Sequence, residues 1–494
     1  MKMASCSRAS RRNAKNALKL KAQARKKGNA ASASLELDKL EPIHRRAAGI
    51  DIGSAENYVA VPQEAVEPGE SPVRVFGVFS QEQDALVEWL RSRQITTVAM
   101  EATGVYWLSL YDKLEAAGIE VYLVDPHGVK AVPGRKSDWL DCQWLQKLHT
   151  YGLLQRAFRP DAPIRRLRTL TRQRAELVCA AASQQQCMEK ALICLNLQLG
   201  LVISDLVGET GLSIIRALLV GERDPEVLVE RYRSQRCTKA TKSEMKQALC
   251  GTYNDEDLFV LQQCVDTWDF LQEQIGECDG KIEVALLAIP TARAVEAKAP
   301  PRPIPAAAEQ PKKKANGTQG KNAPEKDFTS ILRRICGVDL TQVMGLNLLS
   351  VLMLLGEIGT DMSRWRNEKA FCSWLGLCPG AKISGGKVLS RRTRKVTNRA
   401  ATILRLAAVA VGRTDTWIGL FYRRMKARKG GPKAVTATAR KLACIIYHML
   451  KFQEEFVALD MDKYVAHAQA HRLRYLRREA KKLGYDLVEQ EQLA

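Results

Sequence analysis

The sequence lacks the features of a membrane-spanning, secreted or zinc-binding protein. Its longest apolar stretch, residues 345–356, is too short to cross a bilayer, which takes about 20 residues. No apolar segment follows the basic N-terminus, so we expect no secretory signal. The 13 cysteines form no C-x-x-C pair, which favours reduced thiols in a cytoplasmic protein over a zinc site.

Acidic side chains are outnumbered by basic ones. The 54 Asp and Glu residues stand against 76 Lys and Arg residues, which gives a net charge of +22. Hydrophobic residues make up 46% and charged residues 26%, ordinary values for a folded protein, so wholesale disorder is excluded. The surplus of positive charge predicts a polyanionic partner, with nucleic acid ahead of a membrane surface.

Changes in composition along the 494 residues mark the domain boundaries. Residues 1–28 carry ten Lys or Arg and no acid, and seven of the 18 prolines lie between Pro290 and Pro324. Neither segment can bury a hydrophobic core. The expected segments, in chain order, are a basic disordered tail (1–46), an α/β domain (47–158), a helical dimerisation region (159–289), a proline- and lysine-rich linker (290–327), a C-terminal domain (328–455) and a C-terminal helix (456–494).

Hydrophobic periodicity predicts an α/β layer fold in the second segment. Short apolar runs alternate there with stretches of helical spacing. The expected strands are residues 47–51, 58–62, 73–79, 96–100 and 120–124, and the expected helices are residues 81–93, 105–117 and 136–149. This order of elements favours a mixed sheet covered by helices.

The third and fifth segments are predicted to be helical. Residues 165–199 and 255–287 form two long helical stretches, typical of an antiparallel hairpin or coiled coil that serves association. The C-terminal domain carries 19 Lys or Arg and a single acid, Asp415, between Glu368 and Glu454. A folded surface of that charge predicts contact with nucleic acid.

Four carboxylates follow a pattern typical of a magnesium site. Asp51 and Glu101 lie at the ends of apolar strands. Asp138 and Asp141 are three residues apart on a helix and so share a face. Acids at strand ends emerge at the rim where α/β sites lie, and their oxygens suit Mg²⁺. Two such ions about 4 Å apart can hold the attacking and leaving oxygens of a phosphoryl transfer.

Each acid taken alone has a simpler explanation. An aspartate after a strand is usually a turn residue or a helix cap, and Asp138 could be the N-cap of its helix. Asp125 competes as a further carboxylate because it follows the strand at residues 120–124. We rank it lower, since Asp-Pro commonly starts a turn.

Several motifs resemble, in the same order, the two domains of the DEDD transposases of the IS-one-ten insertion-sequence family. Those of the first domain are Gly-Ile-Asp-Ile-Gly (49–53), Met-Glu-Ala-Thr-Gly (100–104), Val-Asp-Pro (124–126) and Lys-Ser-Asp-Trp-Leu-Asp (136–141). Those of the second domain are Phe-Cys-Ser-Trp-Leu-Gly-Leu-Cys-Pro (371–379), Ser-Gly-Gly-Lys (384–387), Thr-Asn-Arg (397–399) and Leu-Arg (404–405).

The resemblance implies a fold with three parts. These are an α/β RNase H-like (RuvC-like) domain, a helical coiled-coil spacer and a mainly α-helical C-terminal transposase domain. It also implies an enzyme whose acids bind two Mg²⁺ ions while a serine of the second domain attacks the DNA phosphodiester and becomes covalently linked to it. Family members often carry two serines before the glycine; here the first position is Ile383, so only Ser384 matches. The implied catalytic residues are Ser384, Asp51, Glu101, Asp138 and Asp141, of which the four acids are the metal ligands.

Positive charge follows the serine motif. A Gly-rich loop lets the backbone approach a phosphate closely, and nearby cations can neutralise charge in a transition state. The candidate nucleic-acid-binding residues are Lys387, Arg391, Arg392, Arg394, Lys395 and Arg399. The simpler explanation of Ser-Gly-Gly is a flexible turn without chemistry.

The resemblance further implies the partners of the protein. These are donor and target DNA, a bridge RNA encoded by the flanks of the element, and further copies of the chain in a dimer or tetramer. The expected location is the prokaryotic cytoplasm at the nucleoid, with no membrane. In such a complex the protein reads shape and backbone charge, while base pairing supplies sequence.

Two other hypotheses fit the same composition. One is a RuvC-like structure-selective nuclease in which metal-activated water attacks, so that Ser384 would be dispensable. The other is a non-catalytic nucleic-acid-binding protein, whose binding would survive the loss of all four acids. The acid quartet argues against the second.

Overall fold

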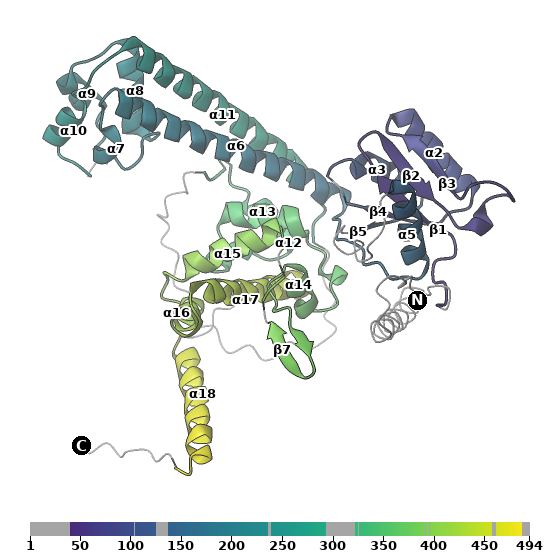
Figure 1. Cartoon of the computed structure of the whole chain (residues 1–494). Coiled ribbons are helices and arrows are strands. Elements are labelled where there is room, and N and C mark those ends of the chain that lie inside the picture. Colours follow the sequence, from purple (N-terminus) through teal and green to yellow (C-terminus); the bar gives the residue numbers. More distant parts are fainter. Residues whose placement is uncertain are drawn as a thin grey trace. The chain divides into compact units, whose positions relative to one another are not determined.

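The chain divides by packing into two compact units, Met1–Arg159 and Pro160–Ala494 (Figure 1). The computed structural model describes residues 40–102, 104–124, 137–235, 239–292, 322–324, 326–390, 392–394, 396–456 and 461–486. Most of the expected basic tail and most of the expected linker therefore lie outside the described residues, as does Asp125.

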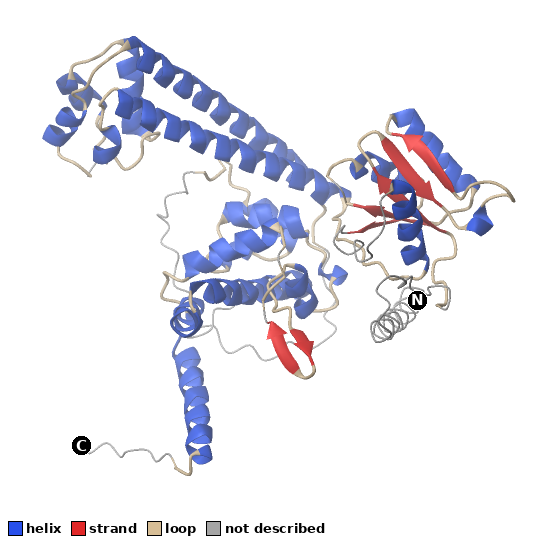
Figure 2. Ribbon diagram, in the orientation of Figure 1, coloured by secondary structure: helices blue, strands red, loops and turns tan. Residues whose placement is uncertain are grey.

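The first unit is an α/β domain around one five-stranded sheet (Figure 2). Its elements are β1 (Ala47–Ile52), β2 (Glu56–Ala60), β3 (Val73–Gly77), α2 (Ser80–Ser92), β4 (Thr97–Glu101), α3 (Trp107–Ala116), β5 (Glu120–Val124) and α5 (Asp138–Thr150). The strand order is β3-β2-β1-β4-β5. The first three strands pair antiparallel, whereas β1, β4 and β5 run parallel. The predicted mixed sheet is confirmed, and its topology fits an RNase H-like fold.

The two faces of the sheet are buried by different helices. Ile50 of β1 and Met100 of β4 pack with the apolar residues of α2 and α3, and both are fully buried. The other face is covered by α5, whose Leu145 packs against Ala99 and Val124. Strand residues alternate between the faces, so the inner strands β1 and β4 are apolar on both sides along most of their length.

The second unit begins with a pair of long helices, α6 (Ala162–Cys194) and α11 (Asp255–Leu287), which run antiparallel (Figure 1). Within the pair, Arg174 forms a buried ion pair with Asp279, with Nε 2.6 Å from Oδ1. Further along, Ala181 of α6 packs with Leu271 of α11. The predicted helical hairpin is confirmed, and α11 has the predicted bounds.

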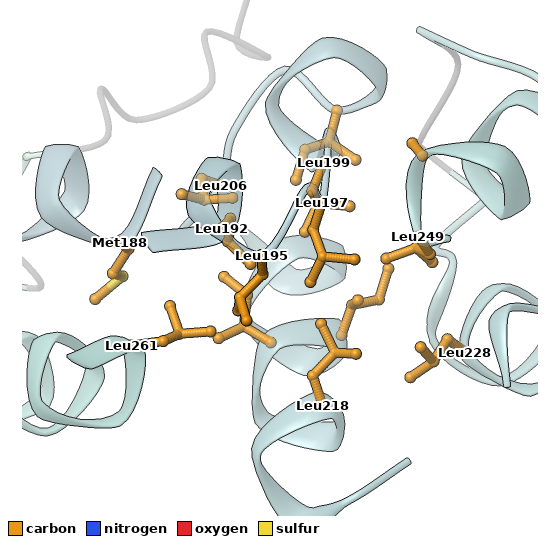
Figure 3. Close-up of a cluster of buried hydrophobic side chains, with 14 of the residues drawn as sticks. Met188, Leu192, Leu195, Leu197, Leu199, Leu206, Leu218, Leu228, Leu249 and Leu261 are labelled. Atoms are coloured by element: carbon orange, nitrogen blue, oxygen red, sulfur yellow. The ribbon is translucent and has the colours of Figure 1, made fainter. Parts of the chain in front are cut away.

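A cap of short helices closes the far end of this pair. These are α7 (Leu199–Val202), α8 (Glu209–Val220), α9 (Pro225–Tyr232) and α10 (Lys242–Ala248). Leucines from all of them except α10, together with leucines of α6 and α11, form one buried cluster (Figure 3). Met245 and Ala248 of α10 complete it. The cap is thus held by aliphatic packing.

The C-terminal domain is mainly helical, as predicted. Its elements are α12 (Thr329–Cys336), α13 (Leu348–Ile358), α14 (Glu368–Trp374), β6 (Lys382–Ser384), β7 (Lys387–Ser390), α15 (Arg399–Val411), α16 (Trp417–Lys429), α17 (Gly431–Phe452) and α18 (Met461–Lys482). Helix α17 packs against α14, α15 and α16 and buries Leu442 and Ile446 completely. None of the described helices is long and apolar enough to cross a membrane.

The C-terminal domain contacts α6 through hydrogen bonds at the end of α13. Arg172 forms two hydrogen bonds with the Glu357 carboxylate, at 2.8 and 2.9 Å. Arg168 donates to the backbone carbonyls of Gly356 and Glu357 at the end of α13. Helix α6 is therefore shared by the long helical pair and the C-terminal domain.

Candidate active site

Asp51 and Glu101 lie beside each other on adjacent parallel strands. Strands β1 and β4 pair with Gly49 opposite Ala99 and Ile50 opposite Met100. The next position in this register places Asp51 next to Glu101. Both acids therefore occur at the same end of the sheet, as the sequence predicted.

Both acids point toward α5. A Cβ atom added to Gly49 would lie 2.3 Å from the Gln146 nitrogen and 2.4 Å from the Cys142 oxygen, so the helix backbone rests on this glycine. Asp51 is two residues further along the strand and shares that face. Glu101 shares it too, because Ala99 packs against α5.

The first turn of α5 supplies the other two acids. Ser137 is the N-cap residue, and Asp138 and Asp141 follow within the first turn. The alternative that Asp138 is the N-cap is therefore wrong. Acids in this turn interact favourably with the helix dipole, so the chain tolerates them there without a further role.

The other three carboxylates lie close enough to Asp51 to perturb it. Asp51 is half-buried, and burial raises its pKa to about 6, with further contributions from the negative charges of Glu101, Asp138 and Asp141. Its hydrogen bond with the Ile52 backbone opposes this shift. The structure thus brings together the four acids of the expected magnesium site.

Three neighbours of Asp51 were not assigned a role from the sequence. Tyr58 is the cross-strand partner of Asp51 on β2, and its hydroxyl donates to Glu56 Oε2 at 3.0 Å. This hydrogen bond raises the pKa of Tyr58, and Asp138 and Asp51 contribute. Cys142 is fully buried below the acids, and burial raises the pKa of its thiol to about 12. The pairing of β1 with β2 brings Tyr58 and Glu56 to the site, and the packing of α5 on β1 brings Cys142.

The acid cluster has the donor chemistry of a magnesium site. All four side chains offer carboxylate oxygens, which hard divalent cations prefer. The repulsion that raises the pKa of Asp51 is the kind that a bound cation relieves. Among the residues that the structure describes, no three His, Cys, Asp or Glu side chains are already arranged to hold a metal ion. The donor set fits Mg²⁺, and the exposed Asp138 and Asp141 are the side chains with room to adjust.

Ser384 lies at the tip of a two-stranded hairpin in the C-terminal domain. It pairs with Lys387 across a two-residue turn of Gly385 and Gly386, whose φ angles are +54° and +76°. Two consecutive positive φ angles are typical of the tight hairpin turn that only glycine adopts freely. The expected Gly-rich loop is therefore an ordered turn, and open space surrounds both glycines.

The predicted nucleic-acid-binding residues differ in their surroundings. Lys387, Arg392 and Arg394 are exposed on or beside the hairpin. Arg399 instead donates to Glu176 of α6 at 3.0 Å, which gives it a structural partner. Arg391 and Lys395 lie outside the described residues.

Two family models match the chain. A transposase model matches residues 48–195, which contain all four acids. The model of the transposase IS116/IS110/IS902 family matches residues 339–423, which contain Ser384 and its hairpin. No curated protein matches the sequence. With both family models in the expected order, and with the acid cluster on the predicted sheet edge, the chain is similar in both units to the IS110 family of transposases, enzymes that act on DNA.

Proposed function

We propose that this transposase cuts and rejoins DNA through a covalent ester between Ser384 and a DNA phosphate, with Mg²⁺ bound by Asp51, Glu101, Asp138 and Asp141. The observation that carries the proposal is the gathering of Glu101, Asp138 and Asp141 around the half-buried Asp51, whose pKa their charges help to raise. Such a cluster is costly for a folded chain unless a cation occupies it. The alternative hypothesis, a nuclease in which metal-activated water attacks, would use the same four acids.

The chemistry divides between the two units. Ser384 forms a bond from Oγ to phosphorus, and the bond from phosphorus to one deoxyribose oxygen breaks, so that this oxygen leaves with a proton as a hydroxyl. The reverse step rejoins a strand and releases the serine, without any need for ATP. Bound Mg²⁺ supplies charge stabilisation at the attacking and leaving oxygens. The acids orient it by offering oxygens from two strands and one helix.

The hairpin suits a residue that must reach a phosphate. Two glycines form its tip, and within the described part of the chain no atom lies within 4 Å of a Cβ added to either, so a phosphate has room to approach. Lys387 lies directly across the hairpin from Ser384 and can neutralise charge as it develops on the phosphoryl oxygens. Arg392 and Arg394 add positive charge near the base of the hairpin.

The proposed partners are donor and target DNA, a bridge RNA and further copies of the chain. The C-terminal domain supports nucleic-acid contact because 19 Lys or Arg accompany a single acid between Glu368 and Glu454. Base pairing with an RNA would supply the sequence choice that a charged surface cannot.

The test is Ser384→Ala in the full chain, incubated with Mg²⁺ and labelled DNA that spans the junction of the element. A denaturing gel should show a covalent protein–DNA adduct for the natural chain and none for Ser384→Ala, while binding is unchanged. Ser390→Ala is the matched control, because Ser390 belongs to the same hairpin and should keep the adduct.

Each rival hypothesis gives a different gel. A nuclease that uses water would yield hydrolysed ends with Ser384→Ala at an unchanged rate. A non-catalytic binding protein would give neither adduct nor cleavage with the natural chain. An adduct that survives in Ser384→Ala would contradict the assignment of the nucleophile.

A further inference from the structure

The hairpin that carries Ser384 exposes an unusual amount of apolar surface. Ile383 is 63% exposed, Val388 is 43% exposed and Leu389 is 69% exposed. These three large aliphatic side chains lie on strands of only three and four residues and are not part of the buried core. Burying each of them elsewhere would be favourable, so a partner surface is expected.

The hairpin separates this apolar surface from the reactive one. Ile383 pairs with Val388 across the strands, and Ser384 pairs with Lys387. Side chains of successive residues point to opposite faces, so one face presents the apolar pair and the other presents the hydroxyl and the ammonium. Leu389 occupies the irregularity in the register and adds to the exposed apolar surface.

Size and charge favour DNA over protein as the partner. Three side chains cannot supply the roughly 1,000 Å² of buried surface that a specific protein interface needs. The space between two stacked bases, by contrast, takes one or two aliphatic side chains. The surroundings are cationic, since Lys387, Arg392 and Arg394 are exposed and residues 369–414 contain no acid.

We propose that Ile383 and Val388 form an apolar wedge that inserts between two stacked base pairs of the bound DNA. The apolar pair lies on the face of the hairpin opposite Ser384 and Lys387. The insertion therefore does not depend on the proposed function of Ser384.

The experiment compares two 30-base-pair duplexes that differ only by a central mismatch. The full-length chain carries Ser384→Ala in every sample, so that no adduct forms. Because a mismatched step is already partly unstacked, the chain with its wedge should bind that duplex about tenfold more tightly than the matched one. With Ile383→Ser and Val388→Ser added, the two affinities should become equal.

A matched control uses exposed aliphatic residues of α15 in the same unit. Leu406 is 66% exposed and Val409 is 40% exposed, close to the values for Ile383 and Val388. Leu406→Ser with Val409→Ser should keep the tenfold preference. All variants should show the same circular dichroism and melting temperature, because the substituted side chains are exposed.

Two outcomes would overturn the wedge. One is a preference for the mismatch that persists in the Ile383→Ser, Val388→Ser variant. The other is a change in the mass of the DNA-free protein on that substitution, measured by light scattering, which would assign the apolar surface to a protein contact. Neither readout depends on the nucleophile, so an adduct in Ser384→Ala would overturn the proposed function and leave the wedge standing.

Discussion

Asp51 is the member of the acid cluster whose negative charge the folded protein disfavours. It is partly withdrawn from water and lies within range of three other carboxylates, which together raise its pKa from 3.8 to about 6. The folded chain therefore holds a proton that the unfolded chain has released between these two pH values. The free energy of unfolding falls as the pH rises through this window, and the penalty is complete above pH 6.

We expect Asp51→Asn to stabilise the metal-free protein at pH 7.5 and to abolish DNA cleavage. The amide keeps the shape of the side chain but removes its charge, for a gain of about 1 kcal/mol once the partial exposure of Asp51 is allowed for. The gain should largely vanish at pH 3.5, where the carboxyl is mostly protonated in both states. The measurement is the melting temperature in EDTA at the two pH values.

The response to Mg²⁺ distinguishes the loss of the Asp51 charge from a nonspecific effect of the substitution on stability. Added MgCl₂ should raise the melting temperature of the natural chain, because binding to the folded state alone stabilises it. It should raise that of Asp51→Asn much less. A variant that melts below the natural chain in EDTA at pH 7.5 would contradict the account of Asp51.

Residue identities in the cluster could be predicted from the sequence, while their neighbours could not. Asp51 and Glu101 are visible as acids that end apolar strands, since strand ends meet at one sheet edge. Tyr58 and Glu56 come close only through the antiparallel register of β1 and β2. Nothing local in the sequence fixes that register, so these residues could be found only in the structure.

At the scale of elements, the contact between β1 and α5 positions the site. Gly49 lets the α5 backbone approach so closely that no side chain fits between them. That approach sets the distance from Asp51 to the first turn of the helix, which carries Asp138 and Asp141. The glycine therefore acts through geometry and not through chemistry.

We expect Gly49→Ala to cost about 3 kcal/mol of stability, because the added methyl would overlap backbone atoms of α5. A helix displaced by about 1 Å would also lower cleavage by about 100-fold. Thermal melts and adduct yield measure the two effects. Gly276→Ala in α11 is the control, since open space surrounds that glycine. A fully active, equally stable Gly49→Ala would disprove this role.

The elements themselves were predicted unevenly. Helix α11 was predicted to the residue because its apolar spacing is continuous over 33 residues. The hairpin of β6 and β7 was read as a loop, since its strands are short and its apolar residues face solvent. Helix α16 was not predicted, and its polar, cationic second half has little apolar periodicity to reveal it.

At the scale of the whole molecule, α11 carries an exposed apolar stripe. Phe259 and Phe270 are 11 residues apart, which is about three helical turns, and Val284 follows after about four more. This spacing places the three on one side of the helix, and all of them are exposed. The stripe is the surface on which we expect this chain to self-associate.

We expect Phe259→Ser with Phe270→Ser to convert the proposed dimer or tetramer into monomers. Each aromatic ring buried at an interface contributes strongly to binding, and serine removes that contribution. The mass in solution, measured by light scattering, gives the result directly. Val220→Ser is the control, because Val220 is a still more exposed apolar residue at the end of α8. An unchanged mass for the double variant would exclude this stripe.

Helix α6 has a consequence for how such proteins exchange parts during evolution. The first family match ends at residue 195 and so includes α6, yet the helix packs with α11 and α13 in the second unit. A chimera joined after residue 195 would combine α6 of another protein with Glu357 and Asp279 of this chain. Both carboxylates would lose their ion pairs unless that protein also carries arginines at positions 172 and 174. Recombinants joined near residue 159 take α6, Asp279 and Glu357 from the same parent protein. The junction that best preserves these ion pairs therefore lies before α6.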